Sequence, residues 1–129
     1  MYLKDIKEWL NETISNKNIT FYIGKIDANK EKVIGIYNKN SNSNKIAVGG
    51  LINTSTSTKA ITILIHWDKN CDTTERMSKC IYELFNGQSV VINKVSAFFI
   101  MKNDEPVFLG TDENGIYEYV IDLDIIYER

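Results

Sequence analysis

The sequence contains little cysteine, histidine or proline: its 129 residues include two cysteines, one histidine and one proline. The cysteines, Cys71 and Cys80, lack the paired spacing of a zinc site and cannot build a disulfide framework. Long hydrophobic runs are also missing, and the N-terminus alternates charged with apolar residues, without the apolar core of a signal peptide. We therefore expect neither a secretion signal nor a membrane span, and we expect the chain to reside in a reducing cytoplasm.

An excess of charge of one sign is absent as well. With 15 basic and 17 acidic residues the formal net charge is −2, so the composition gives no argument for a nucleic-acid-binding surface. The Gly49-Gly50 pair is not followed by the Lys-Ser/Thr of a phosphate-binding loop, which excludes that nucleotide-binding motif. The length suits one domain, and no repeat or linker divides residues 1–129.

The first part of the chain predicts one helix and two strands. Residues 2–15 place apolar side chains at helical spacing. Two β-branched and aromatic runs, 19–26 and 32–39, are separated by the polar sequence DANKE, which suggests a hairpin. The stretch 38–58 is rich in Asn, Ser and Thr, and we expect it to form a flexible loop.

A strand and a second helix follow this stretch. Residues 59–68 alternate in polarity, with three isoleucines and Trp67 on the inward side. Asp72 is placed to cap the next helix and Glu75 to complete a capping box, while Gly87 suits the end of the helix. The expected buried stripe of this helix consists of Met77, Cys80, Ile81, Leu84 and Phe85.

Three strands are predicted after this helix: 89–102, 106–111 and the closing stretch that follows Asn114-Gly115, the strongest short hairpin signal in the chain. The resulting order is α-β-β-β-α-β-β-β. Alternating strands and short turns favour antiparallel pairing with both helices on one sheet face. We therefore predict a two-layer α+β fold with a mainly antiparallel sheet.

The closing strand has two unlike faces. One face carries Tyr117, Tyr119, Ile121, Leu123, Ile125 and Tyr127. The other face carries four carboxylates, with aliphatic residues between them: Glu118, Asp122, Asp124 and Glu128, interspersed with Ile116, Val120 and Ile126. This mixture suits a contact surface, but an ordinary exposed strand face gives the same pattern. Both interpretations stay open at this level.

Candidate catalytic groups are few. His66 is the only histidine, Asp68 shares its side of the strand, and no Gly-x-Ser-x-Gly element supplies a nucleophile, so a half-exposed strand histidine is favoured over a general base. Asp122 and Asp124 share a face, but without a nearby histidine or a calcium-loop pattern they do not indicate a metal site. We expect no enzyme activity, no cofactor and no metal.

Two segments of the C-terminal half carry a family resemblance. One is AITILIHWDKNCDTTERMSKCIYELFNG, a strand followed by an acidic-capped helix and a glycine, and the other is PVFLGTDENGIYEYVIDLDI, a hairpin with an aromatic-Leu-Gly element. With these segments the chain resembles the phage tail terminator family, whose members are often described as minor capsid proteins. The opening helix and strand fit more loosely. Gly49-Gly50 matches the family, but Leu64 and His66 stand at its usual arginine positions, and the prolines often found before the third strand are absent.

The resemblance implies a structural virion protein that caps the upper end of the tail tube as a ring, which is expected to be hexameric. Such a ring ends tube polymerisation and forms the docking surface for head-completion proteins. The implied partners are further copies of the chain, the tail tube protein and a head-completion protein, while DNA passes through without specific binding. Assembly is expected in the cytoplasm of the bacterial host. The alternatives are a head–tail connector or stopper, and a small ligand-binding domain or enzyme that uses His66.

Two groups of residues become candidate sites under this interpretation. The expected interface consists of Asn38, Gly49, Gly50, Asn53, Asp112, Glu113, Asn114 and Gly115. The acidic strand is expected to face the ring channel or a partner, because carboxylates disfavour phosphate binding; it consists of Glu118, Asp122, Asp124 and Glu128.

Overall fold

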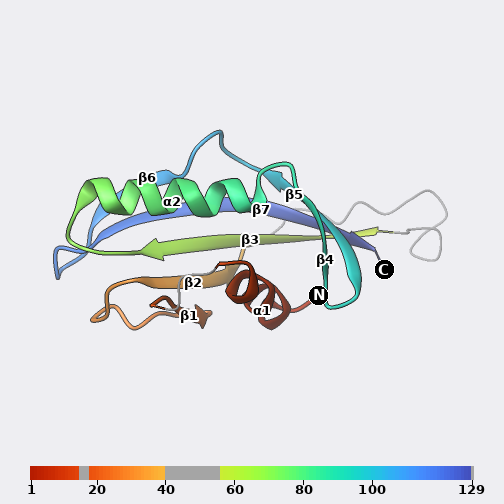
Figure 1. Ribbon diagram of the computed structural model, residues 1–129, viewed down its shortest axis with the longest axis horizontal. Coiled ribbons are helices and arrows are strands. Elements are labelled where there is room, and N and C mark those ends of the chain that lie inside the picture. Colours follow the sequence, from red (N-terminus) through yellow and green to blue (C-terminus); the bar gives the residue numbers. More distant parts are fainter. Residues whose placement is uncertain (15–17, 40–55, 129) are drawn as a thin grey trace.

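The computed structural model describes residues 1–14, 18–39 and 56–128. In this part of the chain, two helices lie against one face of a curled seven-stranded sheet, and the predicted α+β fold is confirmed (Figure 1). The helices are α1 (Leu3–Thr13) and α2 (Cys71–Phe85), and the strands are β1 (Thr20–Ile23), β2 (Val33–Asn38), β3 (Thr56–His66), β4 (Ser89–Ile92), β5 (Val95–Met101), β6 (Val107–Thr111) and β7 (Tyr117–Glu128).

Strand β7 is the centre of the sheet. Along one side it pairs with the whole of β3, and along the other side it pairs with β6 near its start and with β5 near its end. The path across the sheet is β1-β2-β3-β7-β5-β4, and β6 lies beside β7 off this path. Among the described strands, β1 therefore forms one long margin of the sheet, and β6 and β4 form the other.

The predicted hairpin of the first two strands is wrong. β1 and β2 are parallel, with Ile23 opposite Ile36, and theirs is the one parallel pairing among the described strands. The chain turns at Gly24, whose φ of +77° favours glycine, and residues 24–32 lead back to the start of β1. We call residues 24–32 the return segment. Its half-buried Ile26 packs over β2, so the polar DANKE sequence belongs to a packed crossover and not to a tight turn.

The stretch 89–102, expected as one strand, folds back on itself as the hairpin of β4 and β5. Asn93 and Lys94 form its two-residue turn, with φ values of +48° and +66°. Positive φ at both central positions is typical of a type I′ turn, which asparagine adopts readily. The predicted order of helices and strands is confirmed, with this stretch subdivided.

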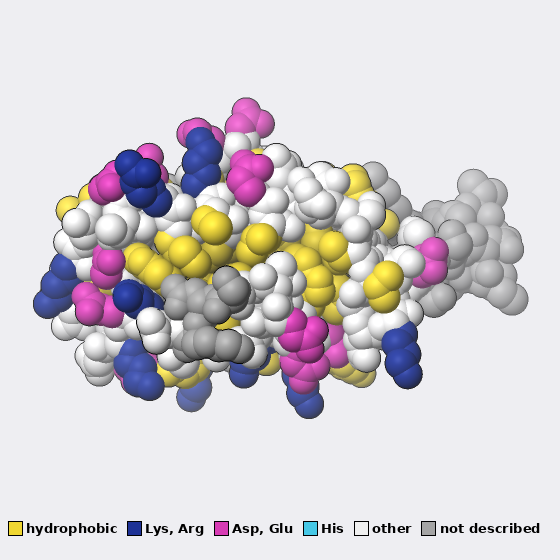
Figure 2. All heavy atoms as spheres, viewed as in Figure 1, with side chains coloured by type: hydrophobic (Ala, Val, Ile, Leu, Met, Phe, Trp, Pro, Cys, Tyr) yellow, Lys and Arg dark blue, Asp and Glu magenta, His cyan; other side chains and the backbone are white. Residues whose placement is uncertain are grey.

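The core lies between the sheet and the two helices. Cross-strand register places Ile63 of β3 opposite Ile121 of β7 on the inward face, where both are buried. Three aromatic rings connect the two layers: Trp9 of α1 lies 5.3 Å from both Phe85 and Phe99 (ring centroids), and the latter two lie 4.9 Å apart. Both helices thus pack on one face through a shared cluster. Figure 2 shows a band of hydrophobic side chains along the molecule between α2 and α1.

Helix α2 begins earlier than predicted. Its N-cap is Asn70, whose Oδ1 accepts hydrogen bonds from the backbone N–H groups of Asp72 (2.9 Å) and Thr73 (3.3 Å). The predicted Asp72 cap is therefore wrong, and Asp72 pairs instead with Arg76 within the first turns. Asparagine and aspartate are equally favourable N-cap residues, so the sequence does not show whether Asn70 or Asp72 caps the helix.

The buried stripe of α2 also differs from the prediction. It consists of Thr74, Ser78, Ile81, Tyr82 and Phe85, whereas the cysteine expected in this stripe, Cys80, is exposed. The three buried hydroxyl groups find acceptors: Thr74 donates to Asp68 Oδ1 at 3.0 Å, Ser78 to the Thr74 carbonyl at 2.7 Å and Tyr82 to the Asn103 carbonyl at 2.7 Å. Because each of these buried hydroxyl groups donates a hydrogen bond, polar residues can occupy the face of α2 that packs against the sheet.

The structure describes only the ends of the stretch expected as a loop, 38–58. Asn38 is the last residue of β2, and residues 56–58 open β3, where they pair with the end of β7. The predicted interface residues Gly49, Gly50 and Asn53 lie outside the described residues.

Candidate assembly surfaces

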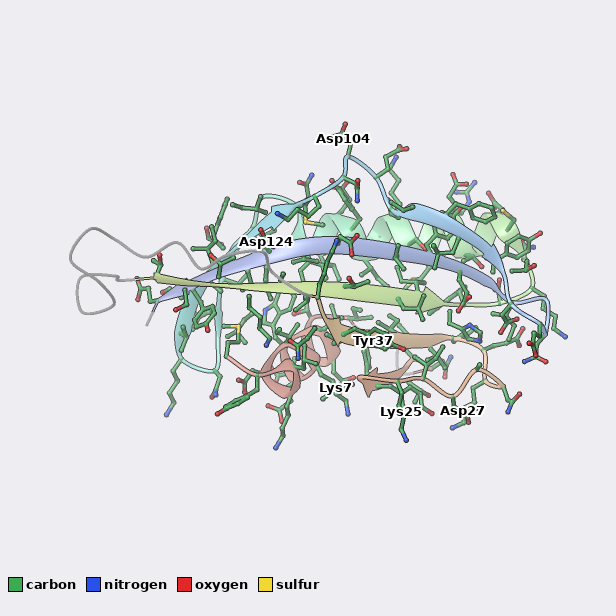
Figure 3. The ribbon with its side chains drawn as sticks, turned by 180° about the vertical axis from the view of Figure 1, so that it is seen from behind. Lys7, Lys25, Asp27, Tyr37, Asp104 and Asp124 are labelled. Atoms are coloured by element: carbon green, nitrogen blue, oxygen red, sulfur yellow. The ribbon has the colours of Figure 1, made fainter. Side chains whose placement is uncertain are left out.

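The face of β7 that points away from the helices carries the predicted carboxylates. Strand alternation places them together there, with Val120 and Ile126 between them: Glu118, Asp122, Asp124 and Glu128. We call this side of the sheet the outer face. No described helix covers it, and Figure 3 shows Asp124 on this side of the sheet.

Two of these carboxylates pair with lysines from other parts of the fold. Asp122 lies 3.0 Å from Lys39 Nζ and accepts a hydrogen bond from Thr62 Oγ1 at 2.6 Å. Asp124 lies 2.7 Å from Lys102 Nζ. The Asp122 and Asp124 side chains are 21% and 19% exposed, so both pairs are better shielded from water than typical surface ion pairs. The acidic row is thus largely neutralised within the chain.

His66 pairs with a third carboxylate, that of Glu118. The histidine is fully buried, its Nδ1 lies 2.9 Å from Glu118 Oε2, and its Nε2 lies 3.0 Å from the Ala28 carbonyl oxygen and 3.6 Å from Asp112 Oδ2. Both ring nitrogens face oxygen acceptors, so only the doubly protonated ring donates at both ends. The expectation of a half-exposed histidine is wrong, because the return segment and the turn between β6 and β7 cover the ring.

The β6–β7 turn contains four of the predicted interface residues. Asp112 Oδ1 accepts hydrogen bonds from the backbone N–H groups of Asn114 (2.9 Å) and Ile116 (3.0 Å), and Gly115 has a φ of +80°. The Asn114 side chain donates to the Ala28 carbonyl at 3.3 Å, which ties the turn to the return segment. Three of the four residues therefore hold the turn together, and Glu113 is left as an exposed side chain.

The described residues contain no cluster of three or more His, Cys, Asp or Glu side chains that could hold a metal ion.

Among the described side chains, three tyrosines have shifted pKa values. Burial, together with the Glu75 carboxylate that accepts its hydroxyl hydrogen bond at 3.3 Å, raises the pKa of Tyr119 to about 12. Burial likewise raises the pKa of Tyr82 and of Tyr37. Tyr82 and Tyr119 act as neutral hydrogen-bond donors in the fold.

Strand β6 exposes three consecutive apolar side chains. Val107, Phe108 and Leu109 are 39%, 53% and 55% exposed, and the Phe108 ring lies 5.3 Å from that of Tyr119. Beyond β6 the described chain has no further strand, so one edge of its backbone is unpaired. The sequence pattern predicts an ordinary hairpin strand for this stretch. The run of three apolar residues after Pro106 was the signal that could have identified it.

A second apolar area lies at the far end of the outer face. A hollow of about 520 Å³ there is lined by Thr56, Ser89, Val90, Val91, Ser96, Ala97, Phe98, Ile126, Tyr127 and Glu128. Val91 and Phe98 are its prominently exposed hydrophobic residues. Of the predicted acidic strand, Glu128 thus borders an apolar hollow, while Asp122 and Asp124 pair with lysines and Glu118 pairs with His66.

Comparison with curated proteins found no match. Among the described residues, no helix combines the length and the apolar character needed to cross a bilayer. Comparison with protein families matched residues 3–129 to the family described as bacteriophage tail terminator protein. The matched range includes both segments that carry the resemblance and every residue of the outer face described above. The chain therefore belongs to the bacteriophage tail terminator family and has a structural role in the phage tail.

Proposed function

We propose that this chain caps the upper end of the phage tail tube as a ring of identical copies, six in the form that the family resemblance implies. The ring would block the addition of further tube subunits and present its free side to a head-completion protein. The observation that carries the proposal is the family match over residues 3–129. The proposed partners are other copies of the chain, the tail tube protein and the head-completion protein, at the head-proximal end of the virion tail.

The margins of the sheet suit a ring. A closed ring with rotational symmetry joins one surface of each copy to a different surface of the next. Figure 1 shows β6 and α2 along one long margin of the molecule and β1 and α1 along the other. One small domain with two unlike margins can satisfy this requirement.

Deletion of the gene tests the capping function. Without the cap, we expect tails of irregular or excessive length that are not joined to filled heads, and electron micrographs of lysates measure both properties. Expression of the wild-type chain from a plasmid should restore them. A connector or stopper would leave tail length controlled and block only head joining, so the same micrographs separate the two functions. Tails of ordinary length joined to filled heads would contradict the proposal.

We propose further that the outer face of β7 lines the channel of the ring. The four carboxylates Glu118, Asp122, Asp124 and Glu128 lie on that face. Lys39 and Lys102, the lysines beside them, are both engaged in ion pairs. Neither lysine is therefore free to bind a DNA phosphate, and DNA could pass through the channel without being retained.

Charge reversal tests the channel assignment. Asp122→Lys combined with Asp124→Lys places unpaired positive charge beside Lys39 and Lys102, and we expect tails that assemble but eject DNA slowly. The matched control exchanges the partners, Asp124→Lys with Lys102→Asp, which keeps both the pair and the net charge. Ejection of DNA from the double lysine variant at the wild-type rate, measured by dye release from purified phage, would rule out the channel assignment.

We also propose that the β6–β7 turn and the 38–53 region contact other tail components. The proposed contact residues are Asn38, Gly49, Gly50, Asn53, Asp112, Glu113, Asn114 and Gly115. Glu113 offers a clean test, because its exposed side chain makes none of the hydrogen bonds that hold the turn. Glu113→Lys should weaken capture of the tail tube or head-completion protein in a pull-down without changing the thermal stability of the chain. Unchanged capture of both proteins would exclude Glu113 from the contact.

A further inference from the structure

The unpaired edge of β6 carries exposed apolar side chains. Val107, Phe108 and Leu109 are each more than one-third exposed, and their strand pairs only with β7 in the described chain. Exposed apolar edge strands are usually protected, since they template pairing with another chain. A hollow of about 230 Å³ beside the strand, between α2 and β6, is lined by Glu75, Lys79, Glu105, Pro106, Phe108 and Tyr119. The strand register shifts between Phe108 and Gly110, which keeps the regular part of the edge short.

Acidic side chains surround this edge. Three carboxylates gather near the Tyr82 hydroxyl: Asp104, Glu83 and Glu105. Among the ion pairs of the described chain, only Glu105 of these three has a partner, Lys79 at 3.7 Å. Asp104, in the connection between β5 and β6, is exposed. The β6 margin therefore combines an apolar strip with unneutralised negative charge.

The β1 margin carries an exposed apolar residue and, in the described chain, unpaired lysines. Strand β1 pairs only with β2 in the described chain, and Ile23 at its end is 38% exposed. Lys25 follows shortly after the strand, and Lys7 lies on α1, which packs beside β1. Neither lysine forms an ion pair among the described residues. Figure 3 shows Lys7 and Lys25, with Asp27 beside Lys25, along one margin of the molecule and Asp104 at the opposite margin.

We infer that the β6 edge of one copy docks against the β1 edge of a second copy. The two strands have similar lengths, five and four residues, so their backbones can pair over a short stretch. Ile23 would meet the apolar strip of β6, while Lys7 and Lys25 would face Asp104 at the rim, as expected of an apolar centre within a complementary charged border. Because the two edges differ, the contact is head-to-tail and repeats from copy to copy. The inference rests on the proposed ring, and it names the surfaces by which neighbouring copies meet.

Engineered disulfides test this docking in assembled tails. The exposed Cys71 and Cys80 are first replaced by serine, and Leu109→Cys and Ile23→Cys are then introduced together or singly. A head-to-tail contact predicts a ladder of covalent oligomers from the chain with both cysteines and no ladder from either single variant. The control pairs Ile23→Cys with Val91→Cys, an exposed position on the edge strand β4, and should give no ladder.

Two outcomes overturn the inference. One is the absence of a ladder from the double variant, in tails that contain the chain, have ordinary length and are joined to heads. This result would contradict the docking but would not contradict the capping function. The other is dimer formation by Leu109→Cys alone, which indicates a symmetric contact between two β6 edges. Failure of the capping function is recognised separately, by ordinary tails in the gene deletion.

Charge reversal gives a second measurement that does not depend on disulfide geometry. Asp104→Lys should reduce the amount of chain recovered with purified tails severalfold, and Lys25→Glu on the same chain should restore it. Both positions are exposed, so neither substitution disturbs the core. Loss without restoration contradicts the assigned pairing of margins, and so does full recovery of the Asp104→Lys chain with tails.

Discussion

His66 joins strand β3, on which it lies, to strand β7, the return segment and the β6–β7 turn. Replacement of His66 by leucine removes these contacts. Three oxygen atoms lose their neighbour: Glu118 Oε2, the Ala28 carbonyl oxygen and Asp112 Oδ2. Leaving buried hydrogen-bond acceptors without their donor costs about 1–3 kcal/mol for each group. The Glu118 side chain is 20% exposed, and water can solvate it in part, so we expect the free energy of unfolding to fall by about 2–3 kcal/mol.

Urea unfolding followed by tryptophan fluorescence measures this loss. Trp67, which follows His66 in the chain, is buried and reports on unfolding of the same region. For a domain of this size the expected loss corresponds to a decrease in melting temperature on the order of 10 °C. His66→Gln should lose less stability than His66→Leu, because the amide can still donate one of the two hydrogen bonds.

A double-mutant cycle separates the His66–Glu118 contact from general packing effects. Glu118→Gln replaces the carboxylate that lies 2.9 Å from His66 Nδ1, so a second substitution, His66→Leu, should cost less in that background by about 1–2 kcal/mol. Two results would refute the reasoning. One is a loss below about 0.5 kcal/mol for His66→Leu alone, the range of ordinary surface substitutions. The other is simple additivity of the two substitutions.

Three further predictions concern the stability of the core and the sheet. Phe85→Ala should lower the free energy of unfolding by about 3–5 kcal/mol, since its ring is fully buried, whereas the half-buried Leu84→Ala should lose less in the same denaturation assay. Gly35→Ala should cost about 1–3 kcal/mol in thermal unfolding, because a Cβ there would lie 2.6 Å from Ile26 Cγ2. Burial, together with the nearby Glu75 carboxylate, raises the pKa of Tyr119 from 10.0 to about 12. Its contribution to stability is therefore complete below pH 10 and is lost as the pH rises to 12, and Tyr119→Phe should flatten this decrease in urea unfolding at each pH.

Much of the fold could be predicted because period-two and helical patterns are local properties. The inward isoleucines of β3 and the two faces of β7 follow from alternation alone, and both lie where expected. The pairing of β1 with β2 could not be predicted. Whether the polar DANKE sequence forms a tight turn or a crossover depends on Ile26 packing above Gly35, a contact between positions that no local pattern links.

The buried stripe of α2 shows a second limit of sequence reasoning. Hydropathy favours Cys80 as a buried residue and Ser78 as an exposed one, yet the structure has the reverse. A serine in a helix can satisfy its hydroxyl with a carbonyl one turn earlier, as Ser78 does with Thr74, so its burial costs little. The same reasoning applies to Tyr82, whose hydroxyl reaches the Asn103 carbonyl across the fold.

The outer face was predicted in part. Alternation places Asp122 and Asp124 together, but their lysine partners come from the end of β2 and from just after β5, which only the tertiary fold brings near. The buried state of His66 was missed for the same reason, because its covering groups belong to the return segment and the β6–β7 turn. The sequence predicts on which face of the sheet a strand residue lies, but it does not show which residues of other segments pack against that face.

The distribution of paired and unpaired charge separates two kinds of surface on this small domain. On the outer face, Asp122 and Asp124 have lysine partners within the chain and Glu118 is hydrogen-bonded to His66, so this face attracts neither phosphate nor a charged protein strongly. At the sheet margins, Asp104 and Lys25 are left without ion-pair partners in the described chain, on opposite sides of the molecule. Unpaired charge steers association and discriminates between partners, whereas internally paired charge does not. A head-to-tail contact between margins would therefore use the charges that folding leaves available, and the neutralised face would remain free for whatever passes beside it.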